Sequence, residues 1–134
     1  MLNALISNEV HMAISGAITA IPHVKDGRLR ALGIGSTRRS HILPDVSTIA
    51  EAGVPGYEAS NWHGLFAPAR TPRAIIERLH EEISIILRSP DVSQRLLSLG
   101  SEPVGSAPDI WGRFVESEVL KWSKVARGAG IKPE

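Results

Sequence analysis

The chain has 134 residues, of which 43% are hydrophobic and 22% charged, and it carries a net charge of +1. A chain of this length is ordinarily one globular domain, and the nearly balanced charge argues against nucleic acid as a partner. There is no cysteine, which excludes disulfides and thiolate metal sites, and no apolar run approaches the ~20 residues of a membrane-spanning helix.

The N-terminal residues have the spacing of a helix. Leu2, Leu5 and Ile6 recur at helical intervals without a preceding N-cap residue, so we expect the chain to begin inside a helix. Met1 to Ile6 also lacks the basic and small-residue features of a secretion signal, so no signal peptide is predicted in this chain. A truncated gene product or an expressed fragment would both show this pattern.

The next residues predict a strand–helix–strand unit. Glu9 to Ile14 alternates as a short strand does, and Ala17 to Lys25 has apolar residues at helical spacing before a stop at Asp26-Gly27. Pro22 is expected at a kink or at the start of a new turn of that helix. Leu29 to Ile34 is nearly all apolar, as in a strand covered on both faces. The fold class predicted here is therefore α/β.

A long connection, Ser36 to Pro68, follows this unit. It contains a basic turn, a Leu-Pro-Asp corner, one short helix and a return rich in glycine and proline. Trp62 to Ala67 is predicted as a third strand at its end. The connection is therefore expected to carry the chain from one sheet to another.

Three helices are predicted in the C-terminal half. The first has Thr71 as its N-cap and Pro72 at its first position, and its apolar stripe should be buried together: Ile75, Ile76, Leu79, Ile83 and Ile86. The second begins at Ser89-Pro90 and ends near Leu99 before Gly100. The third is expected to begin at Ser106, with Asp109 completing a near capping box.

One short segment has the pattern of a ligand site. Ser15, Gly16, Ala17 and Thr19 lie where a strand is expected to end and a helix to begin, the place at which open α/β sheets bind ligands. The first N–H groups of a helix are unpaired and suit a carboxylate, while glycine allows close approach to the backbone. The alternative is that Ser15 only caps the helix. Asn61, at the entry to the third strand, is a further ligand-binding candidate.

Nothing in the sequence assembles the residues of a catalytic or metal centre. The five histidines have no HxxxH or HExxH spacing, there is no GxSxG motif, and Gly33-Ile34-Gly35 lacks the third glycine of a dinucleotide loop. No catalytic residue, metal or cofactor is therefore expected. Arg38-Arg39 could attract an anion, although a solvated turn is the simpler interpretation.

The most specific residues lie in the connection and on both sides of it. They are Ile21-Pro22-His23, Gly27 to Leu32, Leu43 to Val46, Thr48, Ala50 to Glu58, Trp62, Gly64-Leu65, Ala67-Pro68, Thr71-Pro72, Leu99-Gly100, Glu102 to Gly105, Lys121-Trp122, Val125 and Gly130-Ile131. In this order they resemble the tripartite tricarboxylate transporter substrate-binding proteins, also called Bug receptors. The resemblance covers essentially the whole chain but only the C-terminal part of the family, whose members are longer.

The resemblance implies a fold like that of the type II periplasmic binding proteins, present in part. Residues 1–58 would then be the second half of one α/β lobe with the interlobe connection. Residues 59–134 would supply a return strand and the C-terminal helices of the other lobe. Within the family the segment around Ser15 contributes to the cleft that holds the ligand carboxylate. Many members carry an Asp-Ser pair where this chain has Ser15-Gly16.

The function implied by the resemblance is that of an extracytoplasmic, periplasmic receptor for a small carboxylate. Its expected partners are that ligand and the permease subunits of a tripartite tricarboxylate-type transporter, with no nucleic acid. Two alternatives remain: a small α/β enzyme such as a hydrolase that uses a histidine, and a fragment without independent function. Because lone lobes would leave strands unpaired, self-association of the chain is also expected.

Overall fold

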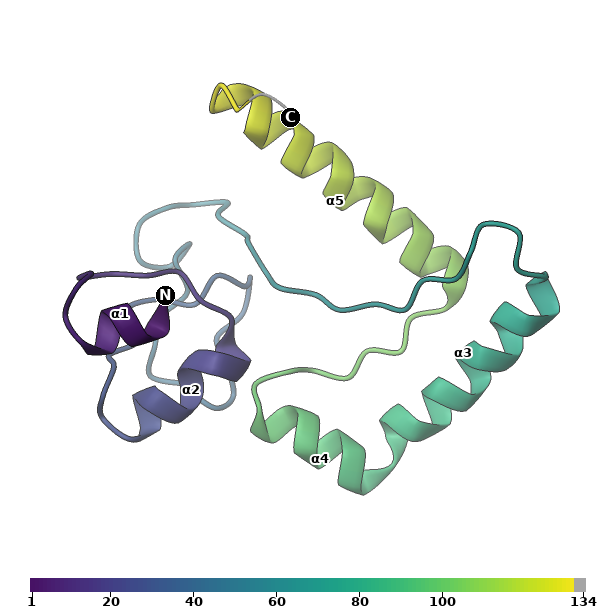
Figure 1. Ribbon diagram of the computed structural model, residues 1–134, viewed down its shortest axis with the longest axis horizontal. Helices are drawn as coiled ribbons and strands as arrows, with labels where there is room; N and C mark the ends of the chain where they lie inside the picture. Colours follow the sequence, from purple (N-terminus) through teal and green to yellow (C-terminus); the bar gives the residue numbers. More distant parts are fainter. Residues whose placement is uncertain (132–134) are drawn as a thin grey trace. The chain divides into compact units, whose positions relative to one another are not determined.

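The computed structural model describes residues 1–131 and contains five helices within them (Figure 1). These are α1 (Leu2–Ile6), α2 (Ala17–Lys25), α3 (Arg73–Arg88), α4 (Pro90–Ser98) and α5 (Pro108–Gly128). The chain divides into unit 1, which comprises Met1–Phe66 and Pro90–Pro103, and unit 2, which comprises Ala67–Ser89 and the chain from Val104 onward. Each of these units has its own packing.

The helices predicted outside the long connection are all present, whereas the three predicted strands are not. Glu9 to Ile14, Leu29 to Ile34 and Trp62 to Ala67 are extended or bent chain, and the described residues hold a single parallel bridge, between Ile34 and Thr48. The strand predictions are therefore wrong for this structure. A strand exists only when a neighbour accepts and donates its ladder hydrogen bonds, and the described residues supply that neighbour at Ile34 alone.

Four helices end in the same hydrogen-bond pattern, in which a residue with positive φ follows the helix. At the end of α2, Gly27 has φ +70°, its N–H bonds to Val24 O at 3.1 Å, and the Arg28 N–H bonds to His23 O at 2.9 Å. The predicted stops after α2 and α4 are thereby confirmed, and Asn8 takes the same role after α1. Pro22 lies inside α2, which nevertheless continues to Lys25.

Unit 1 has a small core in which Ile21 of α2 and Thr48 of the connection are buried, with 4% and 1% of their surface exposed. The turn after α4 lies against α2, because a Cβ added to Gly100 would meet Ile21 Cδ1 at 2.6 Å. Thr48 and Glu51 form a capping box: the Thr48 N–H bonds to Glu51 Oε2 at 2.9 Å and the Glu51 N–H to Thr48 Oγ1 at 3.1 Å. The short helix predicted in the connection is reduced to this one capped turn.

Unit 2 is built on α3 and α5. Arg73 at the start of α3 makes two hydrogen bonds to Asp109 at the start of α5, at 2.8 and 3.2 Å, and a third to Glu77 at 2.7 Å. The pairing with Arg73 lowers the pKa of Asp109 below its ordinary value. Further along α3, Ser84 is buried and a Cβ on Gly105 would lie 3.8 Å from its Oγ, so the segment before α5 packs along this face.

The structure corrects two N-cap expectations for unit 2. The N-cap of α3 is Pro72 rather than Thr71, and the N-cap of α5 is Ala107 rather than Ser106, with no capping bond from a side chain in either case. A residue before proline is driven into extended backbone, and Ala107, with ψ 148° before Pro108, therefore takes the cap position.

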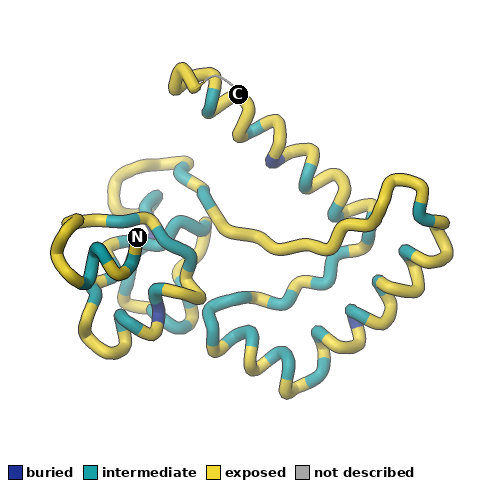
Figure 2. The backbone as a smooth tube through the Cα atoms, in the orientation of Figure 1, coloured by how far each residue is buried: buried dark blue, intermediate teal, exposed yellow. Residues whose placement is uncertain are grey.

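The apolar residues of the α3 stripe are not all buried. Figure 2 shows most of α3 in the colour of exposed residues. Ile75 and Leu79 are each 50% exposed, whereas Ile76 and Ile83 are half-buried beside Ser84. The stripe is wider than the face that α5 and the segment before it cover, so one edge of it stays open.

Candidate functional site

The first turn of α2 is the centre of the candidate site. Gly16 is its N-cap, with extended backbone at φ −66° and ψ 142°, and the Thr19 N–H bonds back to Gly16 O at 3.2 Å. Ala17 and Ile18 are the first two helical residues, so their N–H groups have no carbonyl one turn earlier to bond. These two N–H groups carry the partial positive charge of the helix N-terminus.

The Ser15 hydroxyl does not cap α2, because no side chain makes a capping bond there. Its Oγ lies 3.1 Å from Thr19 Oγ1, and Thr19 Oγ1 donates to Gly16 O at 2.9 Å. A hydroxyl group has only one proton to donate. Because Thr19 donates its proton to Gly16 O, Ser15 is the donor in the contact with Thr19. Thr19 therefore ties Ser15 to the backbone of the first turn.

Asn61 lies directly over Gly16. A Cβ added to Gly16 would sit 2.8 Å from Asn61 Nδ2, closer than real Cβ contacts come. The structure thus brings Asn61 to Gly16, in the turn that Ser15 and Thr19 also stabilise, although the sequence separates Asn61 widely from it. The amide supplies an uncharged N–H donor close to Gly16, the N-cap of α2.

The five candidate residues are accessible to solvent. Ser15 and Gly16 are half-buried, and Ala17, Thr19 and Asn61 are exposed. The groups gathered here are hydrogen-bond donors on a helix N-terminus, and such donors suit an oxyanion. This arrangement can bind and orient an anionic group, and it brings together no acid–base pair.

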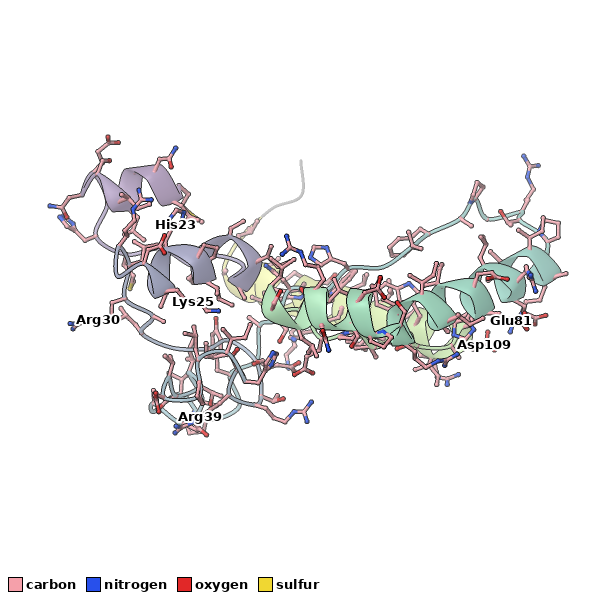
Figure 3. The ribbon with its side chains drawn as sticks, turned by 90° about the horizontal axis from the view of Figure 1, so that it is seen from below. His23, Lys25, Arg30, Arg39, Glu81 and Asp109 are labelled. Carbon is pink, nitrogen blue, oxygen red and sulfur yellow. The ribbon has the colours of Figure 1, made fainter. Side chains whose placement is uncertain are left out.

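Arg39 holds the connection in shape and is already engaged. Its guanidinium bonds to Glu51 Oε2 at 2.8 Å, to Ser47 Oγ at 3.3 Å and to Pro44 O at 3.3 Å, and Figure 3 shows it in the looped part of the chain. The Thr48 N–H and the Arg39 guanidinium lower the pKa of Glu51 below its ordinary value. Arg38 makes an exposed ion pair with Glu102 at 3.6 Å. These contacts of Arg38 and Arg39 fit a solvated turn better than an anion-binding site.

One serine–histidine pair was missed in the sequence, although its i,i+4 spacing on α3 could have revealed it. Ser84 Oγ lies 3.2 Å from His80 Nε2, which is also 3.3 Å from Gly105 O. A carbonyl only accepts, so the contact with Gly105 O is a hydrogen bond in the tautomer that carries the proton on Nε2, and in that tautomer Nε2 cannot take a proton from Ser84. The pair joins α3 to the segment before α5 rather than forming a nucleophile and base. The described residues also contain no cluster that could hold a metal ion.

Comparison with known proteins gives one consistent result. The family of the tripartite tricarboxylate transporter receptors matches residues 1–131. The chain is 40% identical over 122 residues to a UPF0065 protein of a Pseudomonas species. It is 35% identical over 128 residues to the protein BugT of Bordetella pertussis. These matches cover 90% and 96% of the chain but only 36% and 39% of the two relatives.

Solved structures agree with this comparison. An R. palustris protein with adipate matches with a TM-score of 0.90 and 37% identity, covering 99% of this chain and 44% of that one. MatC from Rhodopseudomonas palustris with bound malate matches with a TM-score of 0.84 and 34% identity, covering 92% of this chain and 43% of that one. The periplasmic binding protein BugD matches with a TM-score of 0.79 and 27% identity, over 86% of this chain and 39% of that one. The fold is therefore part of a periplasmic-binding-protein fold, as predicted, and the chain spans less than half of these proteins.

Proposed function

Since the chain belongs to the tripartite tricarboxylate transporter family receptors, we propose that it binds a small carboxylate at the first turn of α2. The observation that carries the proposal is the position of the Asn61 amide over Gly16, beside the unpaired N–H groups of Ala17 and Ile18. In this proposal, the Asn61 amide and these two backbone N–H groups donate to one carboxylate group. The adipate and malate in two matched structures support a carboxylate as the ligand class.

The residues of the site have separate roles in this proposal. The backbone N–H groups of Ala17 and Ile18 bind the carboxylate oxygens, and Asn61 Nδ2 donates to the same group. Gly16 allows Asn61 to approach the start of α2, since any Cβ there would press on the Asn61 amide. Thr19 positions Ser15, whose oxygen lies at the edge of the site.

The wider function follows from the family and rests on it. The receptor would work in the periplasm and deliver its ligand to the permease subunits of a tripartite transporter. Residues 1–58 and 59–134 would contribute to two lobes on either side of a cleft. Binding without chemical change agrees with the N–H donors of Ala17, Ile18 and Asn61, none of which is a nucleophile or a base. A hydrolase has less support, because the His80 Nε2 that contacts Ser84 Oγ is also within hydrogen-bond distance of Gly105 O.

Calorimetric titration of the chain with adipate, and separately with adipamide, tests the proposal. The two compounds have the same carbon skeleton, but the amide carries no negative charge. We expect weak saturable binding of adipate that salt reduces, and no binding of adipamide, because helix N–H donors select for charge. Equal heats for both compounds, or no saturation with adipate, would contradict the proposed function.

A further inference from the structure

The tripeptide Gly33-Ile34-Gly35 of unit 1 lies between two parts of the long connection. On one side, the N–H of its central residue bonds to Ser47 O at 3.0 Å, and the Ile49 N–H bonds back to the O of the same residue at 2.9 Å. On the other side, the Ala59 N–H bonds to Gly35 O at 2.9 Å. The glycines that fail as a dinucleotide loop therefore belong to a junction that orders the connection.

Gly35 lies too close to Ala59 to carry a side chain. A Cβ added to Gly35 would overlap with the carbonyl oxygen of Ala59, which is a backbone atom and cannot rotate away as a side chain can. Neither Gly33 nor Gly35 has a positive φ. The close approach of another backbone, rather than an unusual backbone conformation, therefore requires glycine at position 35.

The contact between Gly35 and Ala59 bears directly on Asn61. Asn61 follows Ala59 by two residues, and two residues of chain span at most about 7 Å. The Asn61 amide is the group that lies over Gly16. The position of Ala59 against Gly35 therefore limits where this amide can lie.

The tripeptide is held more firmly than the segment around Asn61. Its central residue forms the parallel bridge to Thr48, which is 1% exposed in the core of unit 1, whereas Ser60 and Asn61 are exposed. A side chain on Gly35 should therefore displace the segment that contains Asn61 and leave the tripeptide in place. This displacement would carry the Asn61 amide away from Gly16.

We propose that Gly35 is a positioning residue of the ligand site, which acts through the backbone of Ala59 on Asn61 and does not touch the ligand. This role rests on the proposed function as far as the ligand is concerned. The placement of Asn61 over Gly16 can be measured without any ligand, so the role of Gly35 and the proposed function can fail separately.

The first test is nuclear magnetic resonance of the chain without ligand. A Cβ on Gly16 would point at Asn61 Nδ2, so nuclear Overhauser effects should join the Gly16 α protons to the Asn61 side-chain amide. Gly35→Ala should abolish them. Gly33→Ala is the matched control and should keep them, because its Cβ would meet only a side-chain atom within 3.4 Å, Ile49 Cγ1 at 3.1 Å, and a side chain can rotate.

Amide exchange at Ile49 measures whether the junction itself survives. In Gly35→Ala this amide should exchange as slowly as in the unchanged chain, since its bond to Ile34 O lies on the other side of the tripeptide. The proposal is overturned if the Overhauser effects are absent from the unchanged chain, survive Gly35→Ala or are lost in both variants. Fast exchange at Ile49 in Gly35→Ala would overturn it too, because the whole junction would then have opened.

The second test is a double-mutant cycle measured by calorimetric titration with adipate. Gly35→Ala and Asn61→Ala should each weaken binding at least fivefold, and the double variant should bind as Asn61→Ala does, because Gly35 acts only through Asn61. Additive losses, or a loss for Gly35→Ala with none for Asn61→Ala, would overturn the proposal. If the unchanged chain does not bind adipate, the proposed function fails, and the Overhauser effects alone decide the role of Gly35.

Discussion

At the scale of single residues, Gly16 is the position most sensitive to change in the proposed site. Its φ of −66° suits any residue, so a side chain there meets no backbone strain. Gly16→Val should instead push Asn61 aside, because even a Cβ would lie 2.8 Å from its amide. We expect adipate affinity to fall at least tenfold with the unfolding midpoint nearly unchanged, measured by calorimetry and urea denaturation.

The control for this substitution is Gly112→Val, since a Cβ on Gly112 in α5 meets nothing within 4 Å. It should leave adipate affinity unchanged. Loss of binding in both variants, or in neither, would mean that Gly16 does not line the site.

The lowered pKa of Glu51 predicts that the stability of the folded chain depends on pH. Its pKa is lowered in the folded chain by the Thr48 N–H first and by Arg39 second. A lowered pKa gives stability that is complete above the unfolded-state value, about 4.3, and is lost as pH falls through the folded-state value. The midpoint difference between the unchanged chain and Glu51→Gln should therefore shrink as pH falls from 6 toward 3.

Urea denaturation at each pH measures this difference, with Glu116→Gln on the exposed side of α5 as the control. A difference for Glu51→Gln that stays constant down to pH 3 would show that the carboxylate does not hold the turn.

Among the secondary-structure elements, α3 shows that an apolar stripe predicts a helix more reliably than it predicts which residues of that helix are buried. The stripe was read correctly as one side of a helix, but only part of that side is covered. Ile83→Ala, on the half-buried side, should cost about 2 kcal/mol, near the lower end for truncating a buried isoleucine. Leu79→Ala, at a half-exposed position, should cost less than about 1 kcal/mol. Equal costs in urea denaturation would contradict the observed orientation of α3.

The helices could be predicted from the sequence because their signals are local. Apolar spacing, Pro90 and the glycines at Gly27 and Gly100 act within a few residues, and the structure has helices where they indicate. The strands could not, because Leu29 to Ile34 looks the same whether or not another strand pairs with it. The site was half predictable for the same reason: the first turn of α2 is local, whereas the approach of Asn61 to Gly16 is a tertiary contact.

For the whole molecule, the account predicts that the isolated chain associates with itself. The exposed apolar residues of both units leave surface that another copy can cover. Sedimentation velocity at micromolar concentration should show a dimer or a larger assembly. A compact monomer with cooperative unfolding would contradict this prediction.

The central claim is that a carboxylate binds at the first turn of α2, and amide chemical shifts measure it most directly. In a ¹H–¹⁵N spectrum of the chain titrated with adipate, the account predicts that the largest saturable shifts belong to the N–H groups of Ala17 and Ile18. The side-chain amide of Asn61 should move with them, and adipamide should move none of the three. Saturable shifts that avoid this turn, or no saturable shifts at all, would contradict the account.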